Sequence, residues 1–246
     1  MEDPSAWFDA AELEGEVVGV QRLRPLAPAL AWYEGLRVAS SHRRQGIGSA
    51  MVAAALDQAR ELGFGEVRLA TFDPDARRFF EALGFGCRLQ LVSWVASRIE
   101  GDEPAALPTP DQVPKIFGRL QEDPGYRAYG GLNADPDGAL DLDVTELQRL
   151  AAAGRLRQDA GAGSLAIVKA APTRQGARLM ATFLSGQGTA VRDLLAALRF
   201  EADTDGLRGV VLTAPADHPA RARFEEVAYT LRTQPPSSWA IYARRL

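Results

Sequence analysis

The sequence predicts an α/β protein built from two related copies of one fold. Runs typical of strands alternate with helical patterns, a long internal similarity links the two halves, and a stretch rich in proline and acidic residues separates them. A chain of 246 residues is long enough for two small domains. The expected division is a first domain at 1–100, a linker at 101–107 and a second domain at 108–246.

The first copy opens with two runs of β-branched and aromatic residues. The runs EVVGVQRL (16–23) and ALAWYEGLRVA (29–39) are separated by a turn that contains proline, so they predict an antiparallel pair of strands. From residue 47 to 62 the apolar residues recur at helical spacing, which predicts an amphipathic helix ended by Gly63. These apolar positions are Met51, Val52, Ala55, Leu56 and Ala59.

The rest of the first copy alternates between strand and helix. VRLAT (67–71) is a short strand, and CRLQLVSWVASRI (87–99) predicts a final one. Between them DPDARRFFEALGF (73–85) predicts a helix with Asp73 as N-cap, Pro74 at the first helical position and Gly84 at the end.

The internal similarity aligns residues 65–85 with residues 209–229. It predicts a strand at 209–215, a helix over 219–231 and a strand through 238–246. The matched pairs are Asp73 with Asp217, Ala76 with Ala220, Arg77 with Arg221, Phe80 with Phe224, Glu81 with Glu225 and Phe85 with Tyr229, and upstream Gly46 and Gly48 meet Gly186 and Gly188.

A basic loop rich in glycine, SHRRQGIGSA (41–50), precedes the first helix. Backbone N–H groups at a helix N-terminus have no partners within the helix and lie at the positive end of its dipole, so they bind anions well. The loop lacks the lysine of a phosphate-binding Walker motif and the third glycine of a dinucleotide fingerprint. Taken alone, it is either an anion-binding loop or a surface turn with solvated arginines.

The order of these elements over residues 14–98 resembles the GNAT superfamily of N-acetyltransferases. The acetyl-CoA loop of that family reads Arg/Gln-x-x-Gly-x-Gly/Ala, as in residues 43–48 here. The resemblance implies that the CoA pyrophosphate binds the loop amides, that pantetheine pairs with the preceding strand, and that the helix from residue 73 flanks the thioester. The implied cosubstrate is acetyl-CoA. Its expected binding residues are Leu36, Arg37, Val38, Arg43, Arg44, Gln45, Gly46, Ile47, Gly48, Ser49, Asp73 and Phe80.

The sequence departs from the family pattern at three points. The family commonly has Asn where Asp73 stands, and it often has Tyr, which can protonate the leaving thiolate, where Phe80 stands. About 15 residues precede the strand at 16–23, fewer than the family spends on its first strand and two helices. Either the gene start is short or the second copy supplies the missing wall of the acceptor site.

The second copy lacks the basic segment before its glycines. Without it, the loop at 185–188 has no cation for a pyrophosphate, so we expect a degenerate GNAT-like domain that packs on the first and shapes an acceptor cleft. Its acidic stretch NADPDGALDLDVTE (133–146) is expected to be a solvated loop, with attraction of a cationic amine as the alternative.

Acetyl transfer needs a base, and Glu34 on the strand beside the CoA site is the candidate. Its alternative is an exposed strand carboxylate. For the leaving-group acid Tyr33 is a weak candidate, and direct departure of the thiolate is acceptable because a thiol has a pKa of about 8.5. Cys87 is expected to pack as a small apolar residue rather than to carry an acetyl group.

Composition limits the partners. The net charge of −4 argues against nucleic acid, no apolar run reaches the roughly 20 residues that span a membrane, and one cysteine with two histidines implies no metal site. The expectation is a cytoplasmic acetyl-CoA-dependent N-acetyltransferase acting on the primary amine of a small molecule or amino acid. A homodimer is left open. The alternative is a non-catalytic acyl-CoA-binding sensor or interaction protein.

Overall fold

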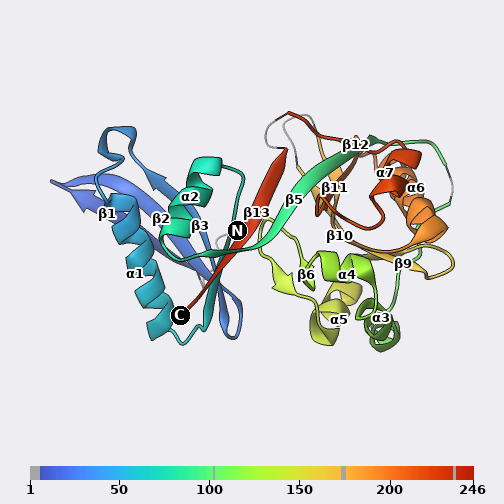
Figure 1. The fold of residues 1–246 in the computed structure, drawn as a ribbon, viewed down its shortest axis with the longest axis horizontal. Helices are drawn as coiled ribbons and strands as arrows, with labels where there is room; N and C mark the ends of the chain where they lie inside the picture. The colour runs from blue at the N-terminus through green and yellow to red at the C-terminus, as the bar shows by residue number, and fades with distance from the viewer. Residues whose placement is uncertain (1–5, 102, 173–175, 235–236) are drawn as a thin grey trace. The chain divides into compact units, whose positions relative to one another are not determined.

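The computed structural model describes residues 6–101, 103–172, 176–234 and 237–246. By their contacts the residues divide into two compact units. Unit 1 holds the chain up to Arg88 together with Pro136–Ala139 and Ala240–Leu246, and unit 2 holds Leu89–Asp135 and Leu140–Trp239. Each unit is a mixed sheet flanked by helices (Figure 1), so the predicted α/β class with two related domains is confirmed.

The sheet of unit 1 is mostly antiparallel. Among its described strands β3 and β4 are parallel to each other, while β1 with β2, β2 with β3 and β4 with β13 are antiparallel. The predicted pair at 16–23 and 29–39 and the strand at 67–71 are thereby confirmed. The strands, in sheet order, are β1 (Trp7–Leu13), β2 (Glu16–Ala27), β3 (Leu30–Val38), β4 (Glu66–Thr71) and the part of β13 (Ser238–Arg245) from Ala240 onward.

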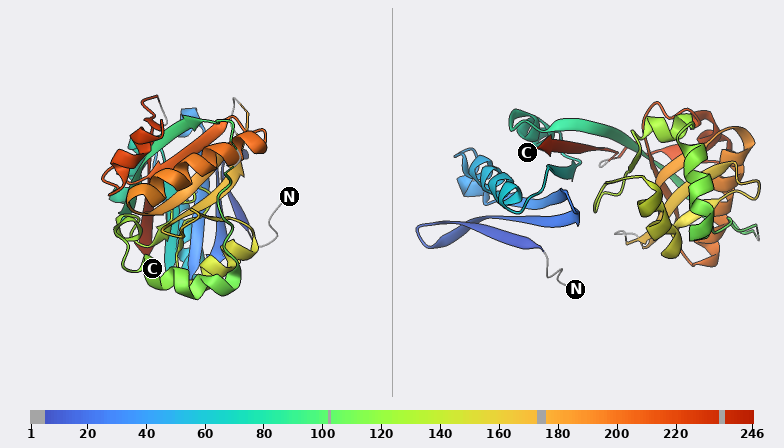
Figure 2. Two further views of the ribbon diagram at one scale, coloured as in Figure 1. Left: turned by 90° about the vertical axis from the view of Figure 1, so that its right-hand side faces the viewer. Right: turned by 90° about the horizontal axis from the view of Figure 1, so that it is seen from below.

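Two helices cover one face of this sheet, α1 (Ile47–Glu61) and α2 (Pro74–Ala82). Both contribute to a single core with β2 and β3, and Figure 2 shows α1 along one side of the β1–β2 hairpin. The five apolar positions predicted for the first helix are the five that α1 buries. Gly63 ends it with a left-handed φ of 82°, as the helical pattern predicted.

A segment from the second half of the sequence reaches unit 1. Residues 136–139 belong to it, and the backbone oxygen of Ala139 accepts a 3.0 Å hydrogen bond from Arg68, which is 4% exposed. The side chain of Arg24 also donates to the backbone oxygen of Asp137. Arg24 and Arg68 both lie directly opposite Trp32, so these three side chains share a face. Ala31 and Tyr33, on either side of Trp32, belong to the core with α1 and α2, so the shared face is the opposite one. Residues 136–139 of the second copy therefore pack against the sheet of unit 1 at Arg24 and Arg68.

Unit 2 carries more helices than unit 1 in the part of the chain that the structure describes. Helix α6 packs against β9, β10 and β11, and α4 packs against β10. Its helices are α3 (Val113–Leu120), α4 (Pro124–Ala128), α5 (Val144–Ala152), α6 (Gly188–Thr204) and α7 (Arg221–Glu226). Its strands are β5 (Gly86–Ser97, from Leu89 onward), β11 (Gly209–Ala214), β10 (Arg178–Gly186), β9 (Ser164–Ala171) and β8 (Leu156–Gln158), with the short β12 (Thr230–Leu231) beside β5 and the separate pair β6 (Leu132–Asn133) and β7 (Leu140–Asp141).

The repeat correctly predicted the strands at 209–215 and 238–246. The helix predicted over 219–231 is shorter, since α7 covers Arg221–Glu226 alone. The reason lies just after it: Ala228 adopts a left-handed φ of 58°, and the chain then pairs Thr230 with Val95 of β5. A helix cannot continue through residues that enter a sheet.

The final strand of each copy belongs to the sheet of the other unit. Strand β5 of the first copy pairs with β11 of the second, with Val95 opposite Val211. Strand β13 of the second copy pairs with β4 of the first, with Tyr242 opposite Leu69. For this reason the compact units change at residues 88–89 and 239–240, and they differ from the division at 101–107 that composition suggested.

Candidate functional site

A pocket of about 1100 Å³ opens in unit 1 where β3 and β4 separate. The two strands pair in parallel over three positions and stop at Trp32 and Arg68. Beyond that point the backbone of residues 33–38 has no strand on its β4 side among the described residues. A diverging pair of parallel strands thus leaves hydrogen-bonding groups available to a ligand.

The basic loop forms one end of the pocket. Its backbone turns at Arg44 and Gly46, which have left-handed φ angles of 62° and 83°. The guanidinium of Arg43 donates to the backbone oxygen of Val38 at 3.0 Å, which holds this side chain against the end of β3. Gly46 is the N-cap of α1 and offers no side-chain cap, so the first N–H groups of α1 stay available to an anion.

Helix α2 forms the opposite wall. Asp73 caps it as predicted, because the Oδ1 atom accepts a hydrogen bond from the backbone of Asp75 at 2.8 Å. This capping bond does not require the carboxamide of the family's usual Asn. Phe80 is 7% exposed and meets the rings of Tyr33 and Phe85 edge-on, at centroid distances of 6.0 and 5.5 Å. It is therefore both a core residue and part of the wall.

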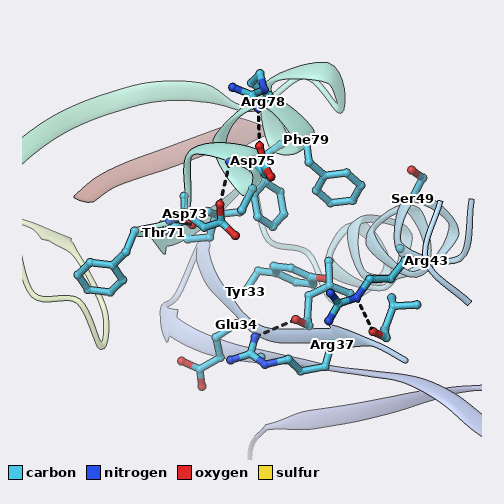
Figure 3. A pocket seen from close by; sticks show the side chains of 18 of the residues that line it. Tyr33, Glu34, Arg37, Arg43, Ser49, Thr71, Asp73, Asp75, Arg78 and Phe79 are labelled. Atoms are coloured by element: carbon cyan, nitrogen blue, oxygen red, sulfur yellow. Dashed lines mark hydrogen bonds and ion pairs between the residues drawn. The ribbon is translucent and has the colours of Figure 1, made fainter. Parts of the chain in front are cut away.

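Glu34 lines the pocket from β3 and is held by two arginines of β2. Its Oε1 atom lies 2.7 Å from Nη1 of Arg22 and 3.4 Å from Nε of Arg24. Figure 3 shows Glu34 and Arg37 below the strand and Tyr33 above it. The carboxylate is thus present in the pocket, and the role of a base stays a prediction.

The structure brings together eleven of the thirteen predicted site residues as lining of this pocket. Gln45 and Ile47 do not line it: the Gln45 amide donates to the backbone oxygen of Ser41 at 3.2 Å, and Ile47 begins α1. The residues that do line it are Glu34, Leu36, Arg37, Val38, Arg43, Arg44, Gly46, Gly48, Ser49, Asp73 and Phe80.

Comparison with known proteins identifies the first unit. Residues 1–85 match the sequence model of the acetyltransferase (GNAT) family. Over these residues the chain is similar to GNAT acetyltransferases. N-acetyltransferase family 8 member 7 of Mus musculus is 35% identical over 92 residues, which cover 35% of this chain and 40% of the mouse protein. The chain thus spans about two fifths of the length of the curated relatives it matches.

Solved structures resemble the fold over nearly the whole chain. A tandem GNAT protein from the clavulanic acid biosynthesis pathway is 17% identical and covers 99% of this chain and 84% of its own, with a TM-score of 0.55. A GCN5-related N-acetyltransferase from Anabaena variabilis is also 17% identical and covers 97% of this chain and 62% of its own, with a TM-score of 0.52. At these identities the likeness supports the fold, including two GNAT-like units in one chain.

The second GNAT-like unit has the corresponding strand separation, but side chains fill it. Strands β10 and β11 pair over three positions and stop at Ala181 and Leu212. Beyond them, Nε2 of His218 lies 3.0 Å from the backbone oxygen of Leu184, and the hydroxyl of Tyr129 donates to the backbone oxygen of Thr213 at 2.7 Å. Both rings are buried, so they occupy the strand edges that are free in the first GNAT unit.

The sequence predicted that the second loop lacks cations. It did not predict that these two rings would occupy the strand edges. The repeat offered one signal, since His218 falls in the register on Pro74, the first residue of α2. Burial lowers the pKa of His218, which keeps the imidazole neutral and able to pair with both backbone groups beside it. Tyr129 gave no such signal, because it follows a short helix with no counterpart in the first copy.

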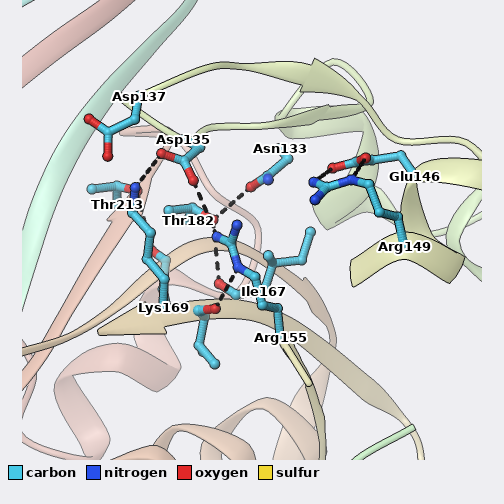
Figure 4. A network of polar contacts seen from close by, with 12 residues as sticks. Asn133, Asp135, Asp137, Glu146, Arg149, Arg155, Ile167, Lys169, Thr182 and Thr213 are labelled. Carbon is cyan, nitrogen blue, oxygen red and sulfur yellow. Dashed lines mark hydrogen bonds and ion pairs between the residues drawn. The ribbon is translucent and has the colours of Figure 1, made fainter. Parts of the chain in front are cut away.

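The acidic stretch at 133–146 is solvated only in part: Asp137, Asp141 and Asp143 are exposed, as expected, whereas Asp135 is buried and paired. Asp135 is 6% exposed and bonds to Lys169 at 2.5 Å and to Arg155 at 3.2 Å. Buried Asn133 accepts a 2.6 Å hydrogen bond from Thr182 (Figure 4). These groups lie on the sheet of unit 2, where burial without a partner would be costly. Asp135 and Asn133 therefore have a structural role in unit 2.

The structure also differs from the expectations for Cys87 and Tyr33. Cys87 is exposed rather than packed, because the first three residues of β5 are exposed. The hydroxyl of Tyr33 donates to Oε1 of buried Gln21 at 2.9 Å, and burial raises the pKa of Tyr33. Its proton is therefore engaged inside the core, which weakens Tyr33 as the acid for a leaving thiolate.

Two absences concern the described ranges only. No helix there is long and apolar enough to cross a membrane. In the same ranges no three His, Cys, Asp or Glu side chains are grouped so that they could hold a metal ion.

Proposed function

We propose that the chain is an acetyl-CoA-dependent N-acetyltransferase that acetylates the primary amine of a small molecule or amino acid. The observation that carries this proposal is the separation of β3 and β4 directly beside the basic loop. In support of the proposal, one pocket of about 1100 Å³ combines the basic loop, a free strand edge and the carboxylate of Glu34. That order suits a long cosubstrate with phosphates at one end and a reactive acyl group at the other.

The residues divide into three roles. The amides at Gly46 and Gly48, with Arg43 and Arg44, hold the pyrophosphate, since backbone donors and guanidinium groups both favour an anion there. The free edge of β3 from Leu36 to Val38 pairs with the pantetheine amides. Asp73 orders the start of α2 at the wall of the pocket through its capping bond.

Glu34 supplies the basic function for acyl transfer. It takes a proton from the ammonium group of the acceptor, so that the amine nitrogen has a free electron pair. The nitrogen then forms a bond to the thioester carbonyl carbon, the carbon–sulfur bond breaks and the thiolate leaves, while the nitrogen gives up a second proton to the thiolate or to solvent and becomes the neutral amide. With Phe80 in the wall and the Tyr33 proton bonded to Gln21, the thiolate departs without a tyrosine acid.

The test is a screen of primary amines with acetyl-CoA that measures release of free thiol and confirms the acetylated product by mass spectrometry. The expected result is turnover with at least one amine, together with CoA binding measured by calorimetry. CoA binding without any turnover would favour the alternative of an acyl-CoA sensor, which Phe80 at the family's tyrosine position supports. Absence of CoA binding would contradict both.

A further inference from the structure

The side chains of Glu34 and Arg37 project from the same face of β3 although they are three residues apart. Arg22 of β2 lies opposite Glu34, and Val20 lies opposite Arg37. Directly opposed residues share a face, and so do residues two apart on one strand, so all four side chains point to one side. A bulge at Gly35, with a φ of 74°, inserts the extra residue that makes this possible.

This face is the one opposite to α1 and α2. Leu36, between Glu34 and Arg37 in the chain, packs against the core on the helical side instead. Arg37 is among the residues that line the pocket, but its side chain extends away from the side on which α1 begins. Its side chain is better placed for an acceptor that approaches Glu34 than for the pyrophosphate (Figure 3).

Arg37 has no acidic partner among the described residues. The guanidinium is exposed, and its hydrogen bond goes to the neutral backbone oxygen of Leu36 at 2.8 Å. Glu34 is already paired with Arg22 and Arg24. Among the described residues, the three guanidinium groups of Arg22, Arg24 and Arg37 share the carboxylates of Glu34 and of Asp137 in the nearby segment, while Arg68 on the same face pairs with Glu66.

We propose that the acceptor is an amine that also carries a carboxylate, as a free α-amino acid does, with its amino group at Glu34 and its carboxylate on Arg37. This inference rests on the proposed function and makes it more specific. A guanidinium binds a carboxylate through two parallel hydrogen bonds, which gives both affinity and orientation. The anion also balances the excess of cations, which a purely cationic amine would increase.

The experiment compares the twenty standard L-amino acids with their C-terminal amides as acceptors for the full chain. Thiol release from acetyl-CoA is measured for each acid and its amide. We expect kcat/KM to be about tenfold or more higher for the acid, because the amide loses the charge-assisted bonds to Arg37. The amino group of an amide is less protonated than that of the acid, so amine ionisation alone would produce the opposite preference.

Substitution of Arg37 connects this preference to one side chain. Arg37→Gln should raise KM for the acid by about tenfold or more and leave its amide within a few-fold, while Arg37→Lys should keep part of the preference. CoA affinity should stay within a few-fold. Arg60→Gln is the matched control, because Arg60 is exposed on α1 outside the pocket and pairs with Asp57.

The outcomes separate this inference from the proposed function. Equal use of acids and amides, or an Arg37→Gln variant that keeps the ratio and loses CoA affinity, would overturn the inference and leave acetyl transfer standing. If none of these acceptors is acetylated, binding of the twenty acids to the CoA-saturated protein is measured by calorimetry. Binding that depends on Arg37 would support the carboxylate site and contradict transfer, whereas no binding would overturn the site.

Discussion

Nη1 of Arg22 lies 2.7 Å from Oε1 of Glu34, across a directly opposed pair of residues on β2 and β3. Arg24, two residues along β2, adds a second contact to the same oxygen at 3.4 Å. The Oε2 atom has no partner among the described residues. The pair therefore fixes the position of the carboxylate and leaves one oxygen to accept a proton.

Replacement of Glu34 by Gln should lower kcat by about 100-fold or more, which is the usual share of general-base catalysis. The amide keeps the shape of the side chain but cannot take a proton. CoA affinity should stay within a few-fold, because the phosphate end of the pocket is unchanged. Steady-state kinetics with a proven acceptor, below the pKa of its amine, is the measurement. The control is Glu61→Gln, an exposed carboxylate at the end of α1. Unchanged kcat would remove Glu34 from the mechanism.

Calorimetry should find one CoA site per chain, and Gly48→Glu should weaken it tenfold or more, since a carboxylate would lie where the pyrophosphate binds. A Cβ atom at Gly48 would lie 3.5 Å from the ring of Phe79, an ordinary contact, so the variant is expected to fold. Gly118→Glu is the control, because that glycine is exposed on α3 of unit 2 with open space around it. Two equivalent sites, or a Gly48→Glu variant with full affinity, would contradict the assignment.

Stability should fall as the pH drops below about 6.5, in part through His218. Burial lowers the pKa of this imidazole below its unfolded value of about 6.5, so the folded state resists protonation and the unfolded state does not. The contribution is complete above that pH and decreases below it, by at most about 1.4 kcal/mol per pH unit. Denaturant unfolding at pH 7.5 and pH 5 measures the difference.

A His218→Gln variant should show less of this pH dependence, because glutamine keeps a donor for Leu184 and does not titrate. His42→Gln, the variant of the other histidine, is the control. If His218→Gln retained the full pH dependence, the effect would have to come from other groups.

Removal of residues 240–246 should abolish CoA binding, although none of them lines the pocket. These residues form the strand that pairs with β4, and Ala240 and Tyr242 belong to the core of unit 1. Calorimetry and the midpoint of thermal unfolding are the measurements. A milder change, Tyr242→Phe, removes the 2.6 Å hydrogen bond to Glu81 and should cost about 1 kcal/mol while CoA still binds. Full CoA affinity in the shortened chain would show that unit 1 does not need this strand.

Local order in unit 1 could be predicted from the sequence because its signals are local. The five buried positions of α1, the cap at Asp73 and the left-handed turn at Gly63 depend on residues within one or two helical turns. The basic loop was found for the same reason, since it connects a strand to a helix. The repeat also predicted the main strands of its own half. The helix that it predicted over 219–231 is shorter than expected, since α7 covers Arg221–Glu226.

The tertiary structure decided which strands pair, on which face of the sheet a side chain lies, and which side chains fill the space between separating strands. A strand such as β5 carries no mark in its own residues of whether β4 or β11 will be its partner, because either offers the same backbone groups. The bulge at Gly35 likewise decides that Arg37 joins Glu34 on one face, which simple alternation would not predict. The rings of Tyr129 and His218 bond to the strand edges of unit 2 at Thr213 and Leu184, which lie 84 and 34 residues away in the sequence. The sequence by itself therefore determined the elements and the anion loop, whereas long-range pairing determined which pocket stays open and which side chains meet there.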